Sequence, residues 1–257
     1  MASFTTVEPV HADDWDQHWL AFSATSEKAP ATLYRRRLAF ELLAVDPRDH
    51  SARMLEIGSG TGCFALDFNA RYPHCRFLGV DLSRAGVELS SQRLPSATFI
   101  QRNLLEPAAA DQRLDYRATH ALCSEVLEHI DDPTLLLRHA AEYMAPGCKL
   151  VVTVPGGRRN AFDKHIGHRR HFTTAQLRDL LEHSGFEVEH TYGAGFPFFN
   201  LYRVFTTLRG RRLIQDVSGK PSWLVQTGSL VFGALFHFNL RNPWGWQTVA
   251  VARYRGE

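Results

Sequence analysis

A short apolar run that ends in three alternating glycines is the feature that most restricts the fold of this chain. Residues 54–62 read Met-Leu-Glu-Ile-Gly-Ser-Gly-Thr-Gly. Glycine lacks a Cβ atom, so it accepts strained dihedral angles and lets a ligand approach the backbone. A second apolar run ends at Asp81, whose carboxylate could accept hydrogen bonds from both hydroxyls of a ribose. This succession of a strand, a glycine turn, a helix, a second strand and an acid predicts a nucleoside-cofactor site.

The spacing of the glycines indicates which nucleoside to expect. The dinucleotide fingerprint needs glycine or alanine at the third position of G-x-G-x-x-G, and here that position is Cys63. The glycines instead fall at 58, 60 and 62, with Glu56 two residues before the first. This pattern resembles the first motif of the class I S-adenosylmethionine-dependent methyltransferases.

A second phrase, residues 124–133, strengthens the resemblance. It reads Ser-Glu-Val-Leu-Glu-His-Ile-Asp-Asp-Pro and follows a strand-like run, residues 119–123. The phrase resembles the ubiquinone-biosynthesis O-methyltransferases and their small-molecule relatives. The glycine triad, Asp81 and this phrase occur in the order found in that family, which supports the resemblance. The resemblance covers most of the chain, from about residue 30 to 195 and again in the last strand.

Strand-like and helix-like runs alternate from residue 50 onward, which predicts an α/β fold with a doubly wound, mostly parallel sheet. The resemblance implies the seven-stranded, Rossmann-like methyltransferase sheet, with the last strand antiparallel beside strand five. We expect one domain, 1–257, whose parts are an N-terminal helical cover (1–48), a cofactor-binding core (49–195), an apolar insertion between the last two strands (196–245) and the last strand (246–257).

The resemblance also implies how S-adenosylmethionine, and its product S-adenosylhomocysteine, would be held. The glycine turn would bind the methionine moiety, Glu56 would orient its amino group, and Asp81 would hold the ribose. Asn103 would touch the adenine amino group, although a plain turn residue is an equal alternative at this position. The expected cofactor-binding residues are Glu56, Gly58, Ser59, Gly60, Gly62, Asp81, Leu82, Asn103, Leu104 and Glu125. Leu82 and Leu104 would enclose the adenine, and Trp15, Trp19 and Phe22 would close over the cleft.

Two histidines are the candidate catalytic residues. Methyl transfer from a sulfonium is an in-line displacement, so the protein mainly positions donor and acceptor. An oxygen acceptor also loses a proton, and histidine is the usual agent. His129 follows strand four, where the resemblance places the active site, and could equally be a pocket wall. His168 lies in a loop with His165 and His171, which could also be a solvated loop.

A metal site is the alternative interpretation of the same region. Glu125, Glu128 and His129 would share one face of a helical turn, a plausible set of ligands for a divalent metal. Small-RNA 3′-terminal 2′-O-methyltransferases use a similar set completed by a downstream histidine, which the loop 163–171, beginning at Asp163, could supply. Many relatives with this phrase use no metal, so a methyltransferase without one is the favoured expectation.

The apolar insertion allows three interpretations. Residues 222–240 carry no charge but include several polar side chains, and spanning a bilayer would separate the last strand from its sheet. A lid over a hydrophobic acceptor is preferred. A membrane-surface helix, with Arg209, Arg211 and Arg212 near anionic lipid, comes second, and a homodimer interface comes third.

Composition narrows the function further. A formal charge of +2 argues against a nucleic-acid partner. Four cysteines without C-x-x-C spacing and an N-terminus without an apolar signal core suggest a cytoplasmic protein, with peripheral membrane contact left open. The expected function is O-methylation of a hydroxyl on an apolar or lipid-like small molecule. The alternatives are a metal-assisted RNA 2′-O-methyltransferase and a protein that binds S-adenosylmethionine without transferring its methyl group.

Overall fold

The expected alternation of strands and helices is confirmed. The computed structural model describes residues 14–27, 29–160, 163–164, 166–209 and 223–256, without the side chains of residues 21–26, 209 and 223–226. The strands are β1 (Arg53–Ile57), β2 (Arg76–Asp81), β3 (Thr98–Gln101), β4 (Ala118–Ser124), β5 (Met144–Pro155), β6 (Phe186–Phe196), β7 (Leu240–Arg241) and β8 (Gln247–Tyr254). The helices are α1 (Trp15–Ser26), α2 (Pro30–Leu43), α3 (Cys63–Arg71), α4 (Arg84–Arg93), α5 (Pro133–Ala141), α7 (Thr174–His183), α8 (Phe198–Arg209) and α10 (Trp223–Leu235), with short 3-10 turns at Ala110–Gln112, Leu127–His129 and Phe236–Phe238.

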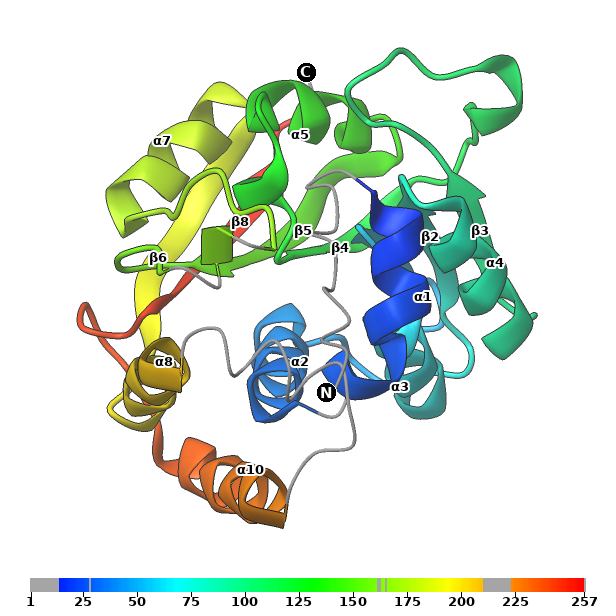
Figure 1. The fold of residues 1–257 in the computed structure, drawn as a ribbon. Coiled ribbons are helices and arrows are strands. Elements are labelled where there is room, and N and C mark those ends of the chain that lie inside the picture. The colour runs from blue at the N-terminus through cyan, green and yellow to red at the C-terminus, as the bar shows by residue number, and fades with distance from the viewer. Residues whose placement is uncertain (1–13, 28, 161–162, 165, 210–222, 257) are drawn as a thin grey trace.

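The sheet has the expected topology with one strand more than expected. Its order is β3-β2-β1-β4-β5-β8-β6-β7, and β8 is antiparallel to both β5 and β6. The expectation of seven strands was wrong, because the chain forms a two-residue strand, β7, against the end of β6 before it enters β8. Helices α5 and α7 cover one face of the sheet, and α2 and α3 cover the other (Figure 1). The fold is therefore doubly wound.

Short-range signals in the sequence place the helices that border the site. The Ser83 hydroxyl accepts a hydrogen bond at the N-terminus of α4, and Asp132 does the same for α5, where Pro133 occupies the first helical position. Thr173 and Gln176 form the predicted capping box of α7. These caps direct the helices away from the carboxyl edge of the sheet, so the loops at this edge are free to carry functional side chains.

The described part of the segment between β6 and β7 contains the helices α8 and α10 and the short turn Phe236–Phe238. The two helices lie beside α2, away from α5 and α7 (Figure 1). The inner faces of these helices join a third core cluster with α2, in which Tyr34, Leu38, Phe199 and Phe236 are buried. Among the described helices, none is both long enough and apolar enough to cross a bilayer.

Candidate active site

The glycine turn after β1 has the strained backbone that its sequence predicts. Gly58, Gly60 and Gly62 all adopt positive φ values, of 73°, 50° and 77°. The amide groups of Gly58 and Ser59 both donate to the carbonyl oxygen of Val80 at the end of β2, at 2.8 and 3.2 Å. The turn is thereby fixed against the neighbouring strand, and its glycines present backbone instead of side chains to a ligand.

We expect Gly58→Ala to destabilise the fold by about 2 kcal/mol or more, because a Cβ atom would require a disfavoured left-handed alanine and would meet a neighbour. That Cβ would lie 2.3 Å from Cγ2 of Val126. Urea denaturation followed by circular dichroism measures the change. Gly228→Ala is the matched control, because a Cβ at this position in α10 would meet nothing within 4 Å and alanine favours helices. The prediction is wrong if the two variants unfold at the same denaturant concentration.

Asp81 binds the glycine turn directly. Its Oδ2 accepts a hydrogen bond from the Gly60 amide at 2.6 Å, and its Oδ1 accepts one from the Ser83 amide at 2.8 Å. A carboxylate offers about four lone-pair sites, so two remain for the hydroxyls of a ribose. Burial raises the pKa of Asp81, although the two amide bonds oppose that rise. The geometry fits the expected role of Asp81.

Glu56 and Ser59 provide further polar atoms that fit an S-adenosylmethionine ligand. Glu56 is 7% exposed, and among the described residues neither its Oε2 nor the Oγ of Ser59 has a hydrogen-bond partner. Burial and the nearby Asp81 raise the pKa of Glu56 well above its usual range. A buried carboxyl without a partner is costly, and an ammonium group from a ligand would offset that cost. These atoms therefore fit the methionine end of the cofactor.

Helix α1 lies across the turn, as the N-terminal sequence suggested. The indole of Trp19 contacts Gly60 so closely that a Cβ there would lie 2.6 Å from it. The carboxylate of Asp16 accepts hydrogen bonds from the Ser83 hydroxyl at 2.6 Å and from the Ala85 amide at 3.0 Å. Trp15 reaches the ring of His129, with 4.7 Å between centroids. The side chain of Phe22, also expected here, lies outside the described residues.

The three residues expected to contact the adenine differ in their exposure and in their hydrogen bonds. Leu82 follows β2 and is 45% exposed, whereas Leu104 is buried. Asn103 uses its side chain within its own turn, accepting from the Leu105 amide at 3.0 Å and donating to Glu106 at 2.7 Å. The turn interpretation of Asn103 therefore has direct geometric support.

Glu125, Glu128 and His129 do not share one face of a helical turn, contrary to the expectation. Glu125 has a φ of 57°, so the chain turns sharply there and the short helix begins only at Leu127. Glu125 consequently points toward Gln247, which donates to it at 2.8 Å, and toward Arg35, at 3.4 Å. The sequence-based prediction was wrong on this point because it assumed one continuous helical turn.

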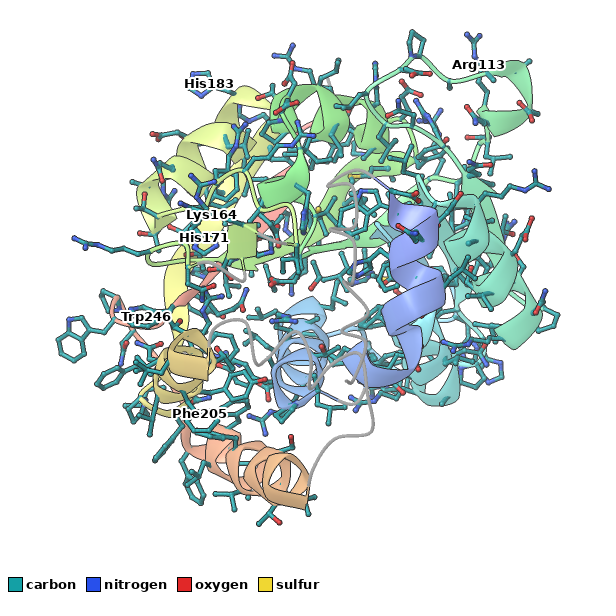
Figure 2. The ribbon with its side chains drawn as sticks, viewed as in Figure 1. Arg113, Lys164, His171, His183, Phe205 and Trp246 are labelled. Carbon is teal, nitrogen blue, oxygen red and sulfur yellow. The ribbon has the colours of Figure 1, made fainter. Side chains whose placement is uncertain are left out.

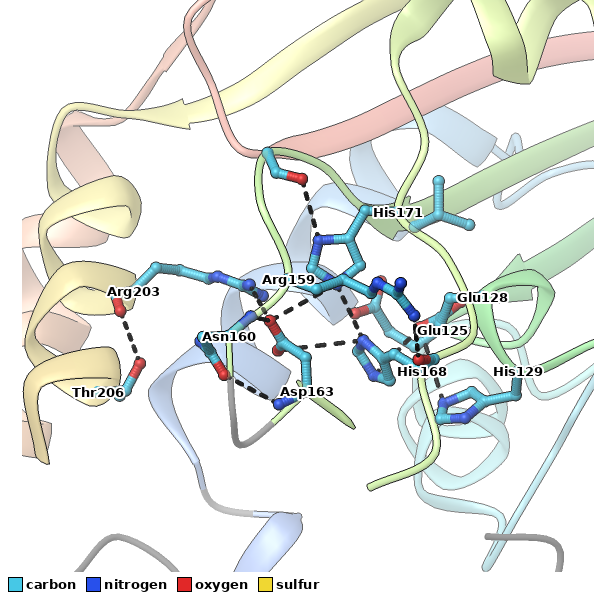
Figure 3. A network of polar contacts seen from close by, with 12 residues as sticks. Glu125, Glu128, His129, Arg159, Asn160, Asp163, His168, His171, Arg203 and Thr206 are labelled. Atoms are coloured by element: carbon cyan, nitrogen blue, oxygen red, sulfur yellow. Dashed lines mark hydrogen bonds and ion pairs between the residues drawn. The ribbon is translucent and has the colours of Figure 1, made fainter. Parts of the chain in front are cut away.

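A different set of side chains converges around Glu128 (Figure 3). The Nε2 atoms of His129 and His168 lie 3.9 and 4.0 Å from the same oxygen, Oε1 of Glu128. Glu128 is fully buried, and neither of its carboxylate oxygens has a hydrogen-bond partner within the described structure. Burial, with Glu125 nearby, raises the pKa of Glu128 well above its usual range. The structure thus brings together the two predicted catalytic histidines around a buried acid.

A relay of hydrogen bonds determines which nitrogen of His168 carries a proton. Nδ1 of His171 lies 3.2 Å from the carbonyl oxygen of Gly157, which can only accept, so Nδ1 carries the proton. Burial lowers the pKa of His171, which favours a neutral ring, and in that form its Nε2 accepts from Nδ1 of His168, at 3.1 Å. Nε2 of His168 therefore carries no proton, and its lone pair is directed at Glu128. Burial and the neighbouring His129 lower the pKa of His168 to about 2, which keeps the ring neutral.

Asp163 and Arg203 hold this relay from the other side, and sequence patterns did not reveal them. Arg203 of α8 pairs with Asp163 at 2.8 Å, and Asp163 lies 3.6 Å from Nε2 of His171. Asp163 was visible only as a member of the histidine loop, and Arg203 only as one of many arginines. Their 40-residue separation explains why no local signal connects them.

Two groups of described residues could hold a divalent metal. One is Glu128, His129 and His168, and the other is Asp163, His168 and His171. Neither includes Glu125, which the sequence placed among the candidate ligands. The donors are carboxylate oxygen and imidazole nitrogen, a set that suits zinc and similar ions. In the second group Asp163 already pairs with Arg203, so the first group is the better candidate.

A family model described as a methyltransferase domain matches residues 27–191. The chain belongs to this methyltransferase-domain family, as the class I glycine turn and the sheet order indicated. A trans-aconitate 2-methyltransferase of Variovorax paradoxus is 31% identical over 132 residues, 49% of each chain. Another, of Rhodopseudomonas palustris, is 27% identical over 225 residues, 84% of this chain and 80% of the relative. For the first of these relatives, the match spans about half of its length.

A solved structure shows the same fold. Phosphoethanolamine N-methyltransferase 2 of Haemonchus contortus, in a complex with S-adenosylhomocysteine, superposes with a TM-score of 0.62. The superposition covers 96% of this chain and 61% of that chain at 15% identity. At this identity the similarity concerns the fold, the Rossmann-like methyltransferase fold.

Proposed function

We propose that this chain transfers the methyl group of S-adenosylmethionine to a hydroxyl oxygen of a small acceptor with an apolar body. The observation that carries the proposal is the convergence of His168 Nε2 and the Glu128 carboxyl beside the cofactor turn. Val126, two residues before Glu128, packs against Gly58. The donor end of the cofactor and the proton-accepting group would therefore occupy adjoining space.

The protonation states of His168 and Glu128 suit a hydroxyl acceptor. A hydroxyl such as a phenol, with a pKa of about 10, must lose its proton as the new bond between carbon and oxygen forms. The lone pair on His168 Nε2 can receive that proton, and the resulting imidazolium would lie 4.0 Å from Oε1 of Glu128, where the carboxylate form of Glu128 would stabilise it. A very low pKa makes His168 a weak base, so this stabilisation by Glu128 is an essential part of the proposal.

The surroundings of the relay suit an apolar acceptor body. Arg203, which pairs with Asp163, follows Tyr202 in α8, and the ring of Tyr202 lies in an aromatic cluster with Phe199, Phe232 and Phe236. Burial raises the pKa of Tyr202, which keeps its hydroxyl neutral. Phe199 and Phe236 are buried against α2, so an acceptor that enters past α8 would meet the partly exposed rings of Tyr202 and Phe232. The resemblance to the ubiquinone-biosynthesis branch points to the same acceptor class.

Methyl-ester formation on a carboxylate is the second candidate, since several relatives are named trans-aconitate 2-methyltransferases. A carboxylate is already ionised at neutral pH and needs no base. A polyanionic acceptor would instead need free cations. Arg35 pairs with Glu125, Arg203 with Asp163, and Arg159 donates to the carbonyl oxygens of His168 and Arg169. This engagement of the arginines favours the hydroxyl acceptor.

An acceptor panel tests the proposal. Purified protein is incubated with S-adenosylmethionine and with phenolic quinone precursors, long-chain alcohols, amines or trans-aconitate, and S-adenosylhomocysteine is quantified. We expect turnover with hydroxylated apolar acceptors. Turnover confined to trans-aconitate would favour the ester, and turnover confined to amines would indicate N-methylation. Tight binding of S-adenosylhomocysteine without turnover on any acceptor would favour the alternative of a protein that binds but does not transfer. A structured RNA is included as one more acceptor, and turnover confined to it would favour the alternative of an RNA 2′-O-methyltransferase.

We expect dialysis against EDTA to leave the rate of methyl transfer unchanged. Ligands of a four- to six-coordinate metal at about 2.1 Å lie about 3.0–3.4 Å apart, whereas the nitrogens of His129 and His168 lie 3.9 and 4.0 Å from Glu128. The assay compares dialysed protein with protein to which Mg²⁺, Mn²⁺ or Zn²⁺ is added back. Loss of activity on dialysis, restored by one ion, would instead assign Glu128, His129 and His168 as its ligands.

A further inference from the structure

Helix α8 is apolar on two opposite sides, and within the described part of the chain only one of them is packed. The inner side carries Phe199, which is 1% exposed and joins the core cluster with α2. The outer side carries Leu201, Val204, Phe205 and Leu208, which are 53, 40, 48 and 81% exposed. These four residues follow the i, i+3, i+4, i+7 spacing of one helix face. A second apolar face therefore points away from the core.

Neighbouring elements extend this outer face. Leu230 and Val231 of α10, with Phe238 just after it, are 77, 51 and 69% exposed. Phe205 and Phe232 bring the two helices into contact, with 6.3 Å between ring centroids. We define the docking face as the exposed apolar side chains Leu201, Val204, Phe205, Leu208, Leu230, Val231, Phe238, Leu240, Trp244 and Trp246. Large contiguous apolar patches on soluble proteins commonly mark interaction sites, so this grouping of exposed apolar side chains on neighbouring elements points to a binding surface.

Two tryptophans stand at the edge of the docking face, and α8 holds their backbone. Asn200 donates to the carbonyl oxygen of Trp244 at 2.7 Å and accepts from the amide of Trp246 at 2.9 Å. Trp244 and Trp246 are 68 and 37% exposed. Tryptophan prefers the boundary between lipid headgroups and acyl chains, because its ring is apolar and its N–H can bond to water.

The charge of the segment that carries the docking face is opposite to that of the rest of the chain. Residues 196–246 contain six arginines or lysines and one acid, Asp216, whereas the remaining residues contain more acids than bases. Neither α8 nor residues 223–246 include an aspartate or glutamate. The side chains of Arg209, Arg211 and Arg212, the expected lipid contacts, lie outside the described residues. They contribute to this argument only the positive charge that the sequence gives them. Of the six basic residues, Arg203 pairs with Asp163 and Arg241 with Glu41. The other four still leave the segment with a net positive charge, which an anionic surface would complement.

We propose that the docking face binds the surface of a bilayer that contains anionic lipid, with α8 and α10 lying in the interface and no helix crossing it. An apolar face, bordering tryptophans and an excess of basic residues are the features of interfacial helices. A second copy that packed its own docking face against this one would also cover apolar side chains, but it would bring the same positive segment into the contact and be repelled. Charge therefore favours the lipid surface over self-association.

The docking face adjoins the candidate active site. The ring of Trp246 packs on Gly157, whose carbonyl oxygen begins the relay to His168. On α8, Arg203 reaches Asp163 and Thr207 receives a hydrogen bond from Asn160, while Val204 and Phe205 face outward. Figure 2 shows His171, Trp246 and Phe205 in succession along one flank of the molecule. A bilayer on the docking face would lie one helix away from the relay.

Vesicle flotation with the full chain tests the proposal. We expect binding to phosphatidylcholine vesicles that contain 30% phosphatidylglycerol, much weaker binding to pure phosphatidylcholine, and release by high salt. The double variant Leu208→Asp with Leu230→Asp should bind at least about tenfold more weakly, because two exposed apolar contacts become anionic. Leu66→Asp, on α3 and 36% exposed, is the matched control and should bind as the parent does.

Three results would overturn the proposal. They are no flotation with either vesicle, flotation that the double variant does not reduce, and flotation equal on neutral and anionic vesicles. A dimer in sedimentation velocity that the double variant converts to a monomer, without vesicle binding, would assign the docking face to a second copy. Circular dichroism and binding of S-adenosylhomocysteine confirm that each variant is folded. Vesicle binding needs no acceptor, so its failure would leave the proposed methyl transfer untouched.

Discussion

Replacing Asp81 by asparagine is expected to weaken binding of S-adenosylhomocysteine by about 100-fold or more. Two charge-assisted hydrogen bonds to ribose hydroxyls would each become weaker, and each such bond contributes about 1.5–3 kcal/mol. The amide NH₂ of asparagine would also stand against the Gly60 or Ser83 amide, both of which now donate to the carboxylate. The glycine turn would then lose one of the contacts that fix it. Isothermal titration calorimetry measures the affinity.

The control for Asp81 separates binding from folding. Asp111→Asn changes an exposed acid that is not among the proposed cofactor-binding residues, and it should leave the affinity unchanged. Because Asp81 is buried, the asparagine variant should also unfold at a lower temperature, so titration is performed well below its melting point. If the folded Asp81→Asn variant binds S-adenosylhomocysteine as tightly as the parent does, the ribose is held elsewhere and this assignment is wrong.

His168→Ala is expected to lower kcat by a factor of about 10²–10⁴ while changing the affinity for S-adenosylhomocysteine little. The variant removes the only nitrogen that the Gly157–His171 relay leaves unprotonated toward Glu128. The cofactor contacts of Gly58, Gly60 and Asp81 are formed by other elements and would persist. The rate is measured with the acceptor that the panel identifies, and binding by calorimetry.

His183→Ala is the matched control, because His183 lies exposed at the end of α7 and its ring Nδ1 bonds to the carbonyl oxygen of Asp179 in the same helix. It should retain full kcat. An equal loss of cofactor binding in His168→Ala would show that His168 supports the structure of the cleft. Unchanged kcat would move the proton acceptor elsewhere and would remove the main argument for a hydroxyl acceptor.

Several elements around the site could be predicted because their signals act over a few residues. The caps at Ser83 and Asp132 satisfy backbone groups three residues away, and the positive φ at Gly58 requires only the absence of a Cβ. The sheet order followed from resemblance, and it was correct in placing the last strand, β8, antiparallel beside β5. The extra strand β7 was missed because two residues carry no periodic pattern.

The candidate site was predicted only in part. The sequence placed His129 and His168 among the catalytic candidates, and the structure brings both to Glu128. It could not reveal that Glu125 turns away, because its partner Gln247 lies 122 residues further along the chain. Contacts of this range depend on how whole elements pack, and no short pattern records them.

By itself, the sequence determined the fold class, the glycine turn and the acid that faces it, since these depend on local backbone geometry and on the alternation of strands with helices. Only the tertiary structure decided which nitrogen of His168 holds no proton, because that depends on the Gly157 carbonyl and His171 meeting across a loop. It also decided which side of α8 is covered. Both sides are apolar in the sequence, and packing against Tyr34 and Phe236 buries one and leaves the other exposed.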